Sequence, residues 1–270
     1  MEKFSNAIFK AMSGVSIVIV TRNRKLLLKK CLASLKGRLG KKAEIIVIDN
    51  ASTDSTADFV KSLNKIKLIK NKKNLGVAAA RNQGVRKSSG DYIIFMDDDA
   101  YFTKYSSLSK VLTYMRKNKQ VALVGPKILY PNGKIQESAR SFPVPLAILW
   151  RGTPLAKLFP NAPFYKSYLL DNSKFIYPTQ VDWVIGACQV VRKSTFRKIG
   201  FLDKGFFFGY EDIDFCLRIK KKGFKVVYFP GFKAVHYYQR TSSRGLISWA
   251  KIEHLKSIAK FFKKIYFSNQ

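Results

Sequence analysis

Short apolar runs alternate with helical stretches through the first hundred residues. The runs are continuous rather than alternating, which is typical of strands buried on both faces. Strands separated by helices of about 10–15 residues predict a parallel sheet with helices on both faces. The predicted strands are 15–20, 44–48, 66–69 and 91–96, and the predicted helices are 25–35, 52–63 and 75–85.

The pattern changes after residue 104. The segment 127–136 predicts a hairpin, because Asn132-Gly133 is a dipeptide that favours tight turns. The segment 141–171 is rich in proline and aromatic residues without clear periodicity, which predicts a long loop or lid. The other predicted elements are helices 105–117 and 211–222 and strands 121–124, 181–191 and 224–229.

The last predicted element is an amphipathic helix over 246–266. It either packs on the sheet or lies on an anionic inner leaflet with its apolar side in the lipid. We therefore divide the chain into an extension (1–13), a main domain (14–240) and a basic loop followed by this helix (241–270). The loop begins around Arg240, Ser242, Ser243 and Arg244, and the apolar side comprises Leu246, Trp249, Ile252, Leu255, Ile258, Phe262 and Ile265.

Basic residues dominate the composition, with 50 Lys and Arg against 17 Asp and Glu and a net charge of +33. Such a surface attracts anionic lipid or nucleic acid nonspecifically. The lysines are scattered along the chain, which argues against a groove that binds a specific nucleic acid. Cys31, Cys188 and Cys216 have no C-x-x-C spacing, which fits a reducing cytoplasm. No apolar run approaches the ~20 residues of a membrane span, so we expect a cytoplasmic protein at the inner face of the plasma membrane.

Six of the seventeen acidic residues fall in two clusters, Asp97-Asp98-Asp99 and Glu211-Asp212-Ile213-Asp214. The first cluster directly follows a buried strand, where α/β sheets place their ligands. A carboxylate about 4 Å from a phosphate charge would cost roughly 4 kcal/mol at an effective dielectric of 20. A Mg²⁺ or Mn²⁺ ion between them reverses that sign. The first cluster therefore predicts a metal site for an anionic substrate, and a solvated acidic turn is the alternative.

Polar residues also follow the other predicted strands and open the third predicted helix. Because the carboxyl ends of parallel strands meet at one edge of the sheet, we expect these side chains to line one crevice with the aspartates. Carboxylate and amide groups there can read the edge of a nucleobase, although turns and helix caps use the same residue types. The residues are Thr21, Asn23, Asp49, Asn50, Asn74, Gly76 and Arg81.

These motifs, in this order, resemble those of family 2 glycosyltransferases, which are nucleotide-sugar enzymes of the GT-A fold. The second half is similar to the rhamnosyltransferase-like branch, and the resemblance covers roughly 14–240. The matching motifs are 16–24, 47–54, 74–82 and 97–99 in the first half, and 182–188, 201–203, 210–214 and 235–236 in the second. The resemblance implies a Rossmann-like, mostly parallel central sheet flanked by helices.

The resemblance also implies roles for individual residues. Asp99, with Asp97 and His236, would bind the divalent cation, and Asp97 or Asp98 would hold the ribose. Asp212 would be the general base, with Glu211 beside it. Trp183 and Tyr210 would contact the acceptor. The implied nucleotide-sugar residues are Thr21, Asn23, Asp49, Asn50, Asn74, Gly76, Arg81, Asp97 and Asp98, of which Thr21 and Asp49 would contact a pyrimidine base.

The implied function is inverting, Mn²⁺- or Mg²⁺-dependent transfer of a sugar, rhamnose among the candidates, from a dTDP- or UDP-sugar donor. The acceptor would be a cell-surface glycan or a polyprenyl-linked glycan at the anionic membrane surface. The alternatives are a basic nucleic-acid-binding protein and a sugar-nucleotide-binding scaffold without catalysis. The sequence leaves the donor, the acceptor and the oligomeric state open.

Overall fold

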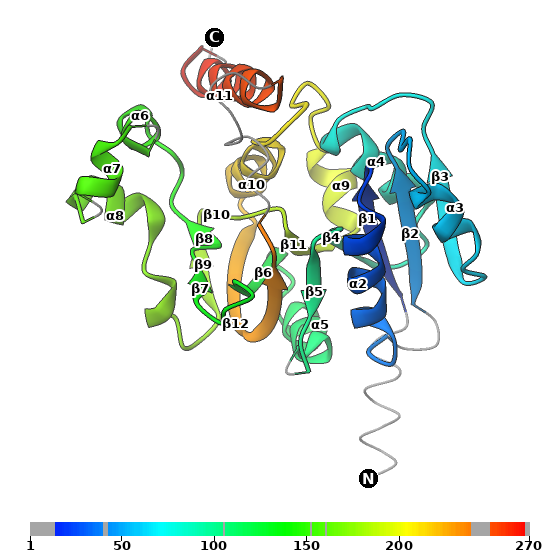
Figure 1. The fold of residues 1–270 in the computed structure, drawn as a ribbon. Helices are drawn as coiled ribbons and strands as arrows, with labels where there is room; N and C mark the ends of the chain where they lie inside the picture. The colour runs from blue at the N-terminus through cyan, green and yellow to red at the C-terminus, as the bar shows by residue number, and fades with distance from the viewer. Residues whose placement is uncertain are drawn as a thin grey trace.

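The computed structural model describes residues 14–39, 43–104, 106–151, 153–159, 161–238 and 249–267. The expected extension (1–13), the basic loop from Arg240 to Arg244 and Leu246 lie outside the described residues. Figure 1 shows a central sheet with helices on both faces and three short helices at one end.

Twelve strands are found in the described part of the chain. They are β1 (Val15–Thr21), β2 (Glu44–Asp49), β3 (Ile66–Lys70), β4 (Tyr92–Asp97), β5 (Ala100–Phe102), β6 (Val121–Leu129), β7 (Ile135–Gln136), β8 (Ala139–Arg140), β9 (Thr179–Val181), β10 (Trp183–Val184), β11 (Cys188–Arg192) and β12 (Lys225–His236). The helices are α2 (Lys25–Leu35), α3 (Thr56–Lys61), α4 (Val77–Lys87), α5 (Leu108–Lys117), α6 (Pro145–Arg151), α7 (Leu155–Leu158), α8 (Pro163–Leu169), α9 (Ser194–Ile199), α10 (Glu211–Lys221) and α11 (Trp249–Phe267), with a 3₁₀ turn at Asn172–Lys174.

The main sheet has ten strands among the described residues, in the order β3-β2-β1-β4-β11-β6-β12-β5, with β7 beside β6 and β9 beside β12. The first four strands are all parallel, as the alternation of strands and helices predicts. Beyond β4 the sheet is mixed, because β11 runs antiparallel to both of its neighbours and β12 runs parallel to β6. The remaining strands, β8 and β10, form a separate antiparallel pair.

Successive residues of the parallel strands pack into two separate apolar layers. Ile17 and Ile19 of β1 lie in the layer under α2, α3 and α5, whereas Val18 lies in the layer under α4, α9 and α10. Strands buried on both sides need apolar residues at every position, which explains their continuous apolar runs. The expected fold class, a GT-A sheet that is mostly parallel and flanked by helices, is therefore confirmed.

Four predicted elements differ in the structure. The expected strand 181–191 is three short strands, because the segment 185–187 leaves the sheet to contact Arg81 and Asp212. The expected loop 141–171 contains α6, α7 and α8. The helix expected at 52–63 begins only at Thr56, and the strand expected at 224–229 continues to His236. The hairpin is confirmed, with Gly133 at φ 84° in its turn.

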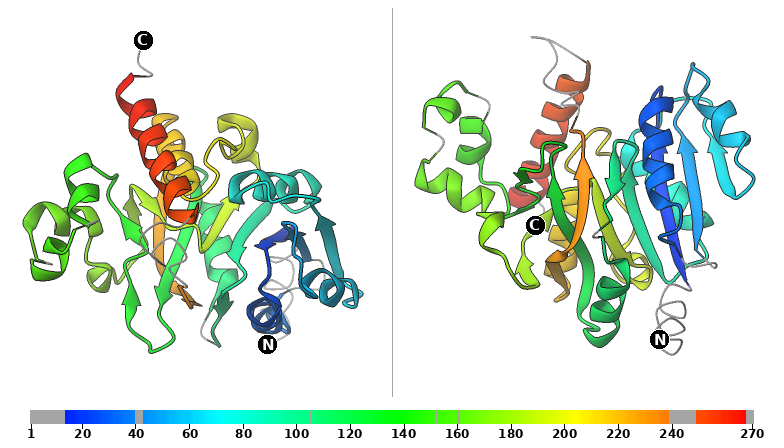
Figure 2. Two further views of the ribbon diagram at one scale, coloured as in Figure 1. Left: turned by 45° about the horizontal axis from the view of Figure 1, so that its top comes forward. Right: turned by 60° about the horizontal axis from the view of Figure 1, so that its bottom comes forward.

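Helix α11 packs on α10, as the views in Figure 2 show. Phe261 is fully buried against the ring of Tyr210, and Lys264 pairs with the buried Asp214. The docked face combines part of the apolar side expected from sequence, Ile258 and Ile265, with the neighbouring Phe261, whereas Trp249 and Leu255 of that side are more than half exposed. Contact of these exposed side chains with lipid stays a prediction.

The three cysteines are buried free thiols, in agreement with the sequence analysis. No helix among the described residues has both the length and the apolar character that crossing a bilayer requires.

The docked face of α11 can be tested by truncating one side chain on each of its faces. Phe261→Ala should lower the free energy of unfolding by about 3–5 kcal/mol, because it leaves a cavity beneath the helix. Leu255→Ala, the matched control on the exposed face, should change it by less than about 0.5 kcal/mol. Urea denaturation would measure both, and equal losses would contradict the packing described.

Candidate active site

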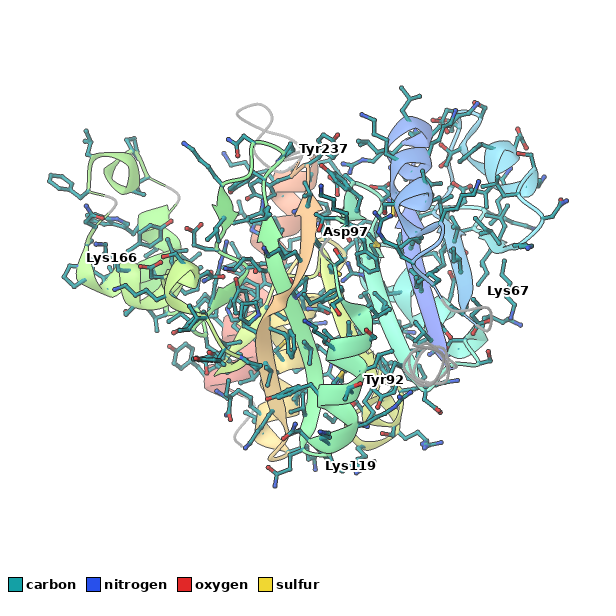
Figure 3. All side chains as sticks on the ribbon, turned by 90° about the horizontal axis from the view of Figure 1, so that it is seen from below. Lys67, Tyr92, Asp97, Lys119, Lys166 and Tyr237 are labelled. Carbon is teal, nitrogen blue, oxygen red and sulfur yellow. The ribbon has the colours of Figure 1, made fainter. Side chains whose placement is uncertain are left out.

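A cleft of about 700 Å³ opens where the first and fourth strands end. Its walls come from both halves of the chain: the ends of β1 and β4, the start of α10, and the β8–β10 pair with α8. In Figure 3, Asp97 and Tyr237 lie at one edge of the sheet, and Tyr92 and Lys119 lie at the opposite edge. This is the edge at which the sequence predicts the ligand site.

Each of the three adjacent aspartates has its own set of cations or hydrogen-bond donors as partners, and Asp98 and Asp99 share Arg24. Asp97 pairs with Arg81 at 2.7 Å. Asp98 accepts a hydrogen bond from Thr21 at 2.8 Å and lies 3.2 Å from Arg24. Asp99 lies 3.4 Å from Arg24 and 3.2 Å from the Nε2 atom of His236. The buried Arg81 and the partly exposed Arg24 thus offset the repulsion between adjacent carboxylates.

Asp97, Asp99 and His236 together could hold a metal ion, since one ligand atom of each lies within 4.8 Å of the others. Two carboxylates and an imidazole suit Mn²⁺ or Mg²⁺, the oxygen-preferring ions that the sequence indicates. The Nδ1 atom of His236 lies 2.9 Å from the Oε1 atom of Gln136. That contact sets the orientation of the ring and turns Nε2 toward the carboxylates.

Burial and close charges act in opposite directions on the pKa values of this cluster. Burial raises the pKa of Asp98 to about 7, against the opposing charge of Arg24. Burial also works against charge on Asp99 and His236, but their mutual hydrogen bond outweighs it, lowering the pKa of Asp99 and raising that of His236. Arg24 and His236 therefore favour the charged form of the aspartates against the effect of burial.

Arg81 is the cation that joins the two halves of the site. Its buried guanidinium donates to Asp97, to the backbone oxygen of Gly186 at 2.8 Å and to Glu211 at 3.3 Å, and it lies over the ring of Phe95. Burial disfavours its charge, but the carboxylates around it raise its pKa above the ordinary value. Its contacts link α4, β4, the segment 185–187 and α10.

Glu211 and Asp212 begin α10, directly after Tyr210, which has a left-handed φ of 68°. Asp212 accepts hydrogen bonds from the backbone of Gly186 and Ile213, each at 2.8 Å. Burial raises the pKa of Asp212, and burial with the neighbouring Asp212 charge raises the pKa of Glu211 to about 7. Asp214 instead accepts a hydrogen bond from Arg218 at 2.8 Å.

Asp49 is fully buried next to Thr21, its partner in the β1–β2 register. One of its carboxylate oxygens accepts from the backbone of Ser52 at 3.3 Å. The other oxygen, Oδ1, has no hydrogen-bond partner among the described residues. A buried acceptor without a partner costs free energy unless a ligand or water supplies a donor.

Some of the other expected site residues line the cleft and others do not. Asn74, Gly76, Trp183 and Tyr210 all line the cleft, whereas neither Asn23 nor Asp49 does. The amide of Asn23 bonds instead to the segment before α3. Asn50 lines the cleft, but its amide bonds to Asn71, Asn74 and the backbone of Leu75. The assignments of Asn23 and Asn50 to the nucleotide stay predictions.

Sequence reasoning missed three residues at this site. Arg24 pairs with two of the aspartates, Gln136 orients His236, and Gly186 holds both Arg81 and Asp212. Arg24 stands within the first motif, so its nearness to Thr21 was the only available signal. Gln136 and Gly186 act through contacts that no local pattern predicts.

Comparison with known families and sequences shows what this chain is similar to. Residues 16–200 match the family described as glycosyl transferase family 2, and residues 167–242 match the N-terminal domain of galactosyltransferase. The chain is 26% identical over 255 residues to N-acetylglucosaminyl-diphospho-decaprenol L-rhamnosyltransferase of Mycobacterium tuberculosis, covering 88% of this chain and 80% of that protein. It is 29% identical to rhamnosyltransferase WbbL of Escherichia coli over 200 residues, which cover 71% and 68% of the two chains.

Solved structures share the fold. GalNAc-T7, described with UDP, GalNAc and Mn²⁺, has a TM-score of 0.65 and 18% identity, covering 96% of this chain and 51% of its own. The mannosyltransferase PcManGT of Pyrobaculum calidifontis, in complex with GDP-Man and Mn²⁺, has a TM-score of 0.63 and 18% identity, covering 92% and 64%. The chain thus spans about half of the first of these proteins.

The raised pKa of Glu211 predicts a pH dependence of stability. Between its ordinary pKa and about 7, the folded protein keeps a proton on Glu211 that the unfolded chain loses. Stability from this group therefore falls as pH rises through that window. Glu211→Gln cannot ionise, so its unfolding free energy relative to wild type should rise between pH 5 and pH 7, by on the order of 1–3 kcal/mol.

Urea denaturation at the two pH values would measure this difference. A Glu211→Gln difference that is the same at both pH values would contradict the raised pKa.

Proposed function

The chain belongs to glycosyl transferase family 2 and is a glycosyltransferase, and we propose that it transfers a sugar, with inversion, from a nucleotide donor to a lipid-linked acceptor. The observation that carries the proposal is one cleft that holds both the Asp97–Asp99–His236 group and Asp212. In this reaction the departing diphosphate and the attacking hydroxyl, with its general base, lie on opposite sides of one carbon. Family membership favours this enzyme over the nucleic-acid-binding and scaffold alternatives.

The leaving diphosphate belongs at the aspartate end of the cleft. Asp97, Asp99 and His236 would hold a Mn²⁺ or Mg²⁺ ion, which supplies positive charge to the phosphates. Two of the solved structures with this fold are described with Mn²⁺. Arg24, which already lies against Asp98 and Asp99, offers a second cation to the same charge.

Asp212 is the proposed general base. The acceptor hydroxyl oxygen forms a bond to C1 of the sugar, the bond from C1 to the phosphate oxygen breaks, and the hydroxyl proton passes to the Asp212 carboxylate. The raised pKa of Asp212 makes that carboxylate a better proton acceptor than an exposed aspartate. Gly186 fixes one of its oxygens by a backbone hydrogen bond.

The nucleotide is proposed to lie over the ends of the first two strands. Thr21 and Asp49 would face a uracil or thymine base, whose ring N–H could satisfy the Oδ1 atom of Asp49. Asp97 or Asp98 would hold the ribose. Asn74 and Gly76 line the same wall, and a Cβ atom on Gly76 would lie 2.7 Å from the backbone of Phe207. Position 76 in that wall therefore has no space for a residue larger than glycine.

The acceptor is proposed to enter from the side of Trp183 and Tyr210. Aromatic rings suit the apolar faces of a sugar, and both residues line the cleft. The relatives named as rhamnosyltransferases make rhamnose the first donor sugar to test, as a dTDP or UDP conjugate. The net charge of +33 favours work at an anionic membrane surface on the cytoplasmic side.

Removing the base should abolish transfer without abolishing donor binding. Asp212→Asn should lower kcat for sugar transfer by about 10²–10⁴-fold, because the amide cannot accept the proton. Asp58→Asn, on the exposed surface of α3, should have no effect. A coupled assay of nucleoside diphosphate release would measure both, and an active Asp212→Asn enzyme would remove this residue from the mechanism.

Metal dependence is tested through donor binding. In a thermal-shift screen of dTDP-, UDP- and GDP-sugars, the matching donor should raise the melting temperature in the presence of Mn²⁺ and much less with a chelator. Asp99→Ala should lose the Mn²⁺-dependent part of the shift, whereas Asp171→Ala on the surface should keep it. A shift that is the same with and without metal would argue against the proposed ion.

A further inference from the structure

The arginines that line the cleft do not all have carboxylate partners. Arg24 and Arg81 are paired with aspartates or glutamate, and Arg22 is exposed at the end of β1. Arg140 lies on the opposite wall, on β8, and forms no ion pair with any described residue. Its Nε atom donates to the backbone oxygen of Glu137, and no protein acceptor among the described residues takes a hydrogen bond from its two terminal nitrogens. A guanidinium with two available donors on a cleft wall is suited to a phosphate.

The surroundings of Arg140 form a rigid site. Its guanidinium lies 5.3 Å from the ring centre of Trp183 and 5.9 Å from that of Tyr168, and both rings are almost fully buried. Ser141 ties the two rings together, because it donates to the backbone of Tyr168 and accepts from the indole of Trp183. The side-chain oxygen of Asn172 accepts from the backbone at the start of β8. An arginine held in this way loses little freedom when it binds an anion.

Arg140 and the proposed base line the same cleft and are joined by one short stretch of chain. Arg140 is the register partner of Trp183 in the β8–β10 pair. Gly186, three residues after Trp183, donates its backbone N–H to Asp212 at 2.8 Å. Three extended residues span at most about 10 Å, so Trp183 and Gly186 place Arg140 and Asp212 on neighbouring parts of the cleft. A hydroxyl at Asp212 and a phosphate at Arg140 can therefore belong to one acceptor.

The surface beyond Arg140 is apolar. Helices α6, α7 and α8 follow β8 and lie beside it in Figure 1. They carry a second hollow, of about 620 Å³, lined by Trp150, Leu158, Phe159, Asn161 and Ala162. Leu146 and Leu149 of α6 are also more than half exposed. A hydrocarbon chain leaving a phosphate at Arg140 would find contact area here.

We propose that Arg140, between Trp183 and Tyr168, is a second anion subsite that binds the phosphate nearest the acceptor sugar, with the lipid chain running over α6–α8. This inference rests on the proposed function and narrows it, since it makes the acceptor a sugar linked to a lipid through phosphate rather than a neutral glycan. The donor diphosphate has its own place at the aspartate end of the cleft. The cleft thus holds two separate phosphate sites, one on each wall.

Binding of geranyl diphosphate tests the subsite directly. The titration is made with Mn²⁺ and saturating UDP and dTDP together, so that the donor end of the cleft is filled. Wild type should bind geranyl diphosphate at least tenfold more tightly than geraniol. Arg140→Gln should bind it at least tenfold more weakly than wild type, and Arg140→Lys should fall between them because lysine keeps the charge but not the planar fork. Lys134→Gln, which removes one exposed charge from the hairpin, should match wild type.

Two results would overturn the subsite: an Arg140→Gln affinity within twofold of wild type, or equal wild-type affinities for geranyl diphosphate and geraniol. If Arg140→Gln does not fold, as judged by circular dichroism, Arg140→Lys and the geraniol comparison decide the matter. In that case either unchanged binding in Arg140→Lys or the absence of a wild-type preference for geranyl diphosphate over geraniol refutes it.

Transfer assays separate this inference from the proposed function. The acceptors are N-acetylglucosamine on a geranyl diphosphate and the same sugar as a neutral octyl glycoside. Transfer to both with equal kcat/KM in wild type would leave the glycosyltransferase in place and remove the phosphate subsite. Arg140-dependent binding of geranyl diphosphate without any transfer would keep the subsite and remove the proposed reaction.

Discussion

The buried guanidinium of Arg81 is the interaction on which the rest of the site depends. It brings together Asp97, Glu211 and the backbone of Gly186, from elements that lie up to 130 residues apart in the chain. Without a cation between them, the half-buried Asp97 of β4 and the buried Glu211 of α10 would repel each other or take up protons. The GT-A sheet supplies the edge, and Arg81 makes it possible for both acidic motifs to meet there. The same contacts hold Gly186, which in turn holds Asp212.

The charge of the cleft is the reverse of the charge of the chain. A protein of net charge +33 concentrates its few acidic residues where two substrates are expected to react. Each of these carboxylates is matched by a particular neighbour: Asp98 and Asp99 by Arg24, and Asp99 also by His236. On the opposite wall the guanidinium of Arg140 lies near two aromatic rings and forms no ion pair with a described residue. The cleft therefore presents one wall suited to a metal-bound diphosphate and another suited to a bare phosphate.

The peripheral helices α6 and α11 carry exposed apolar side chains. Helix α11 docks on α10 through Phe261, which contacts Tyr210, and through Lys264, which pairs with Asp214. It leaves Trp249 and Leu255 exposed, as α6 leaves Leu146 and Leu149. Apolar side chains exposed on several helices around one cleft are typical of proteins that meet a large apolar ligand or a lipid surface. Both kinds of contact agree with an acceptor that carries a lipid.

Local pattern determined much of this protein. Strands β1 and β4, the Asn132-Gly133 turn and the positions of the two acidic clusters follow from apolar runs and turn residues, because burial on both faces requires a continuous apolar run whatever the neighbouring strand is. The resemblance of the ordered motifs then indicated the family. Only the tertiary structure decided which partner each polar residue has: that Asn50 bonds to its neighbouring loop, that Arg24 pairs with the aspartates, and that the segment 185–187 leaves the sheet. It also decided that α11 docks with Phe261 fully buried, while Trp249 and Leu255 stay more than half exposed. A sequence pattern records that a residue is buried or charged, but the free energy of an ion pair or a packed ring depends on a partner that is distant in the chain.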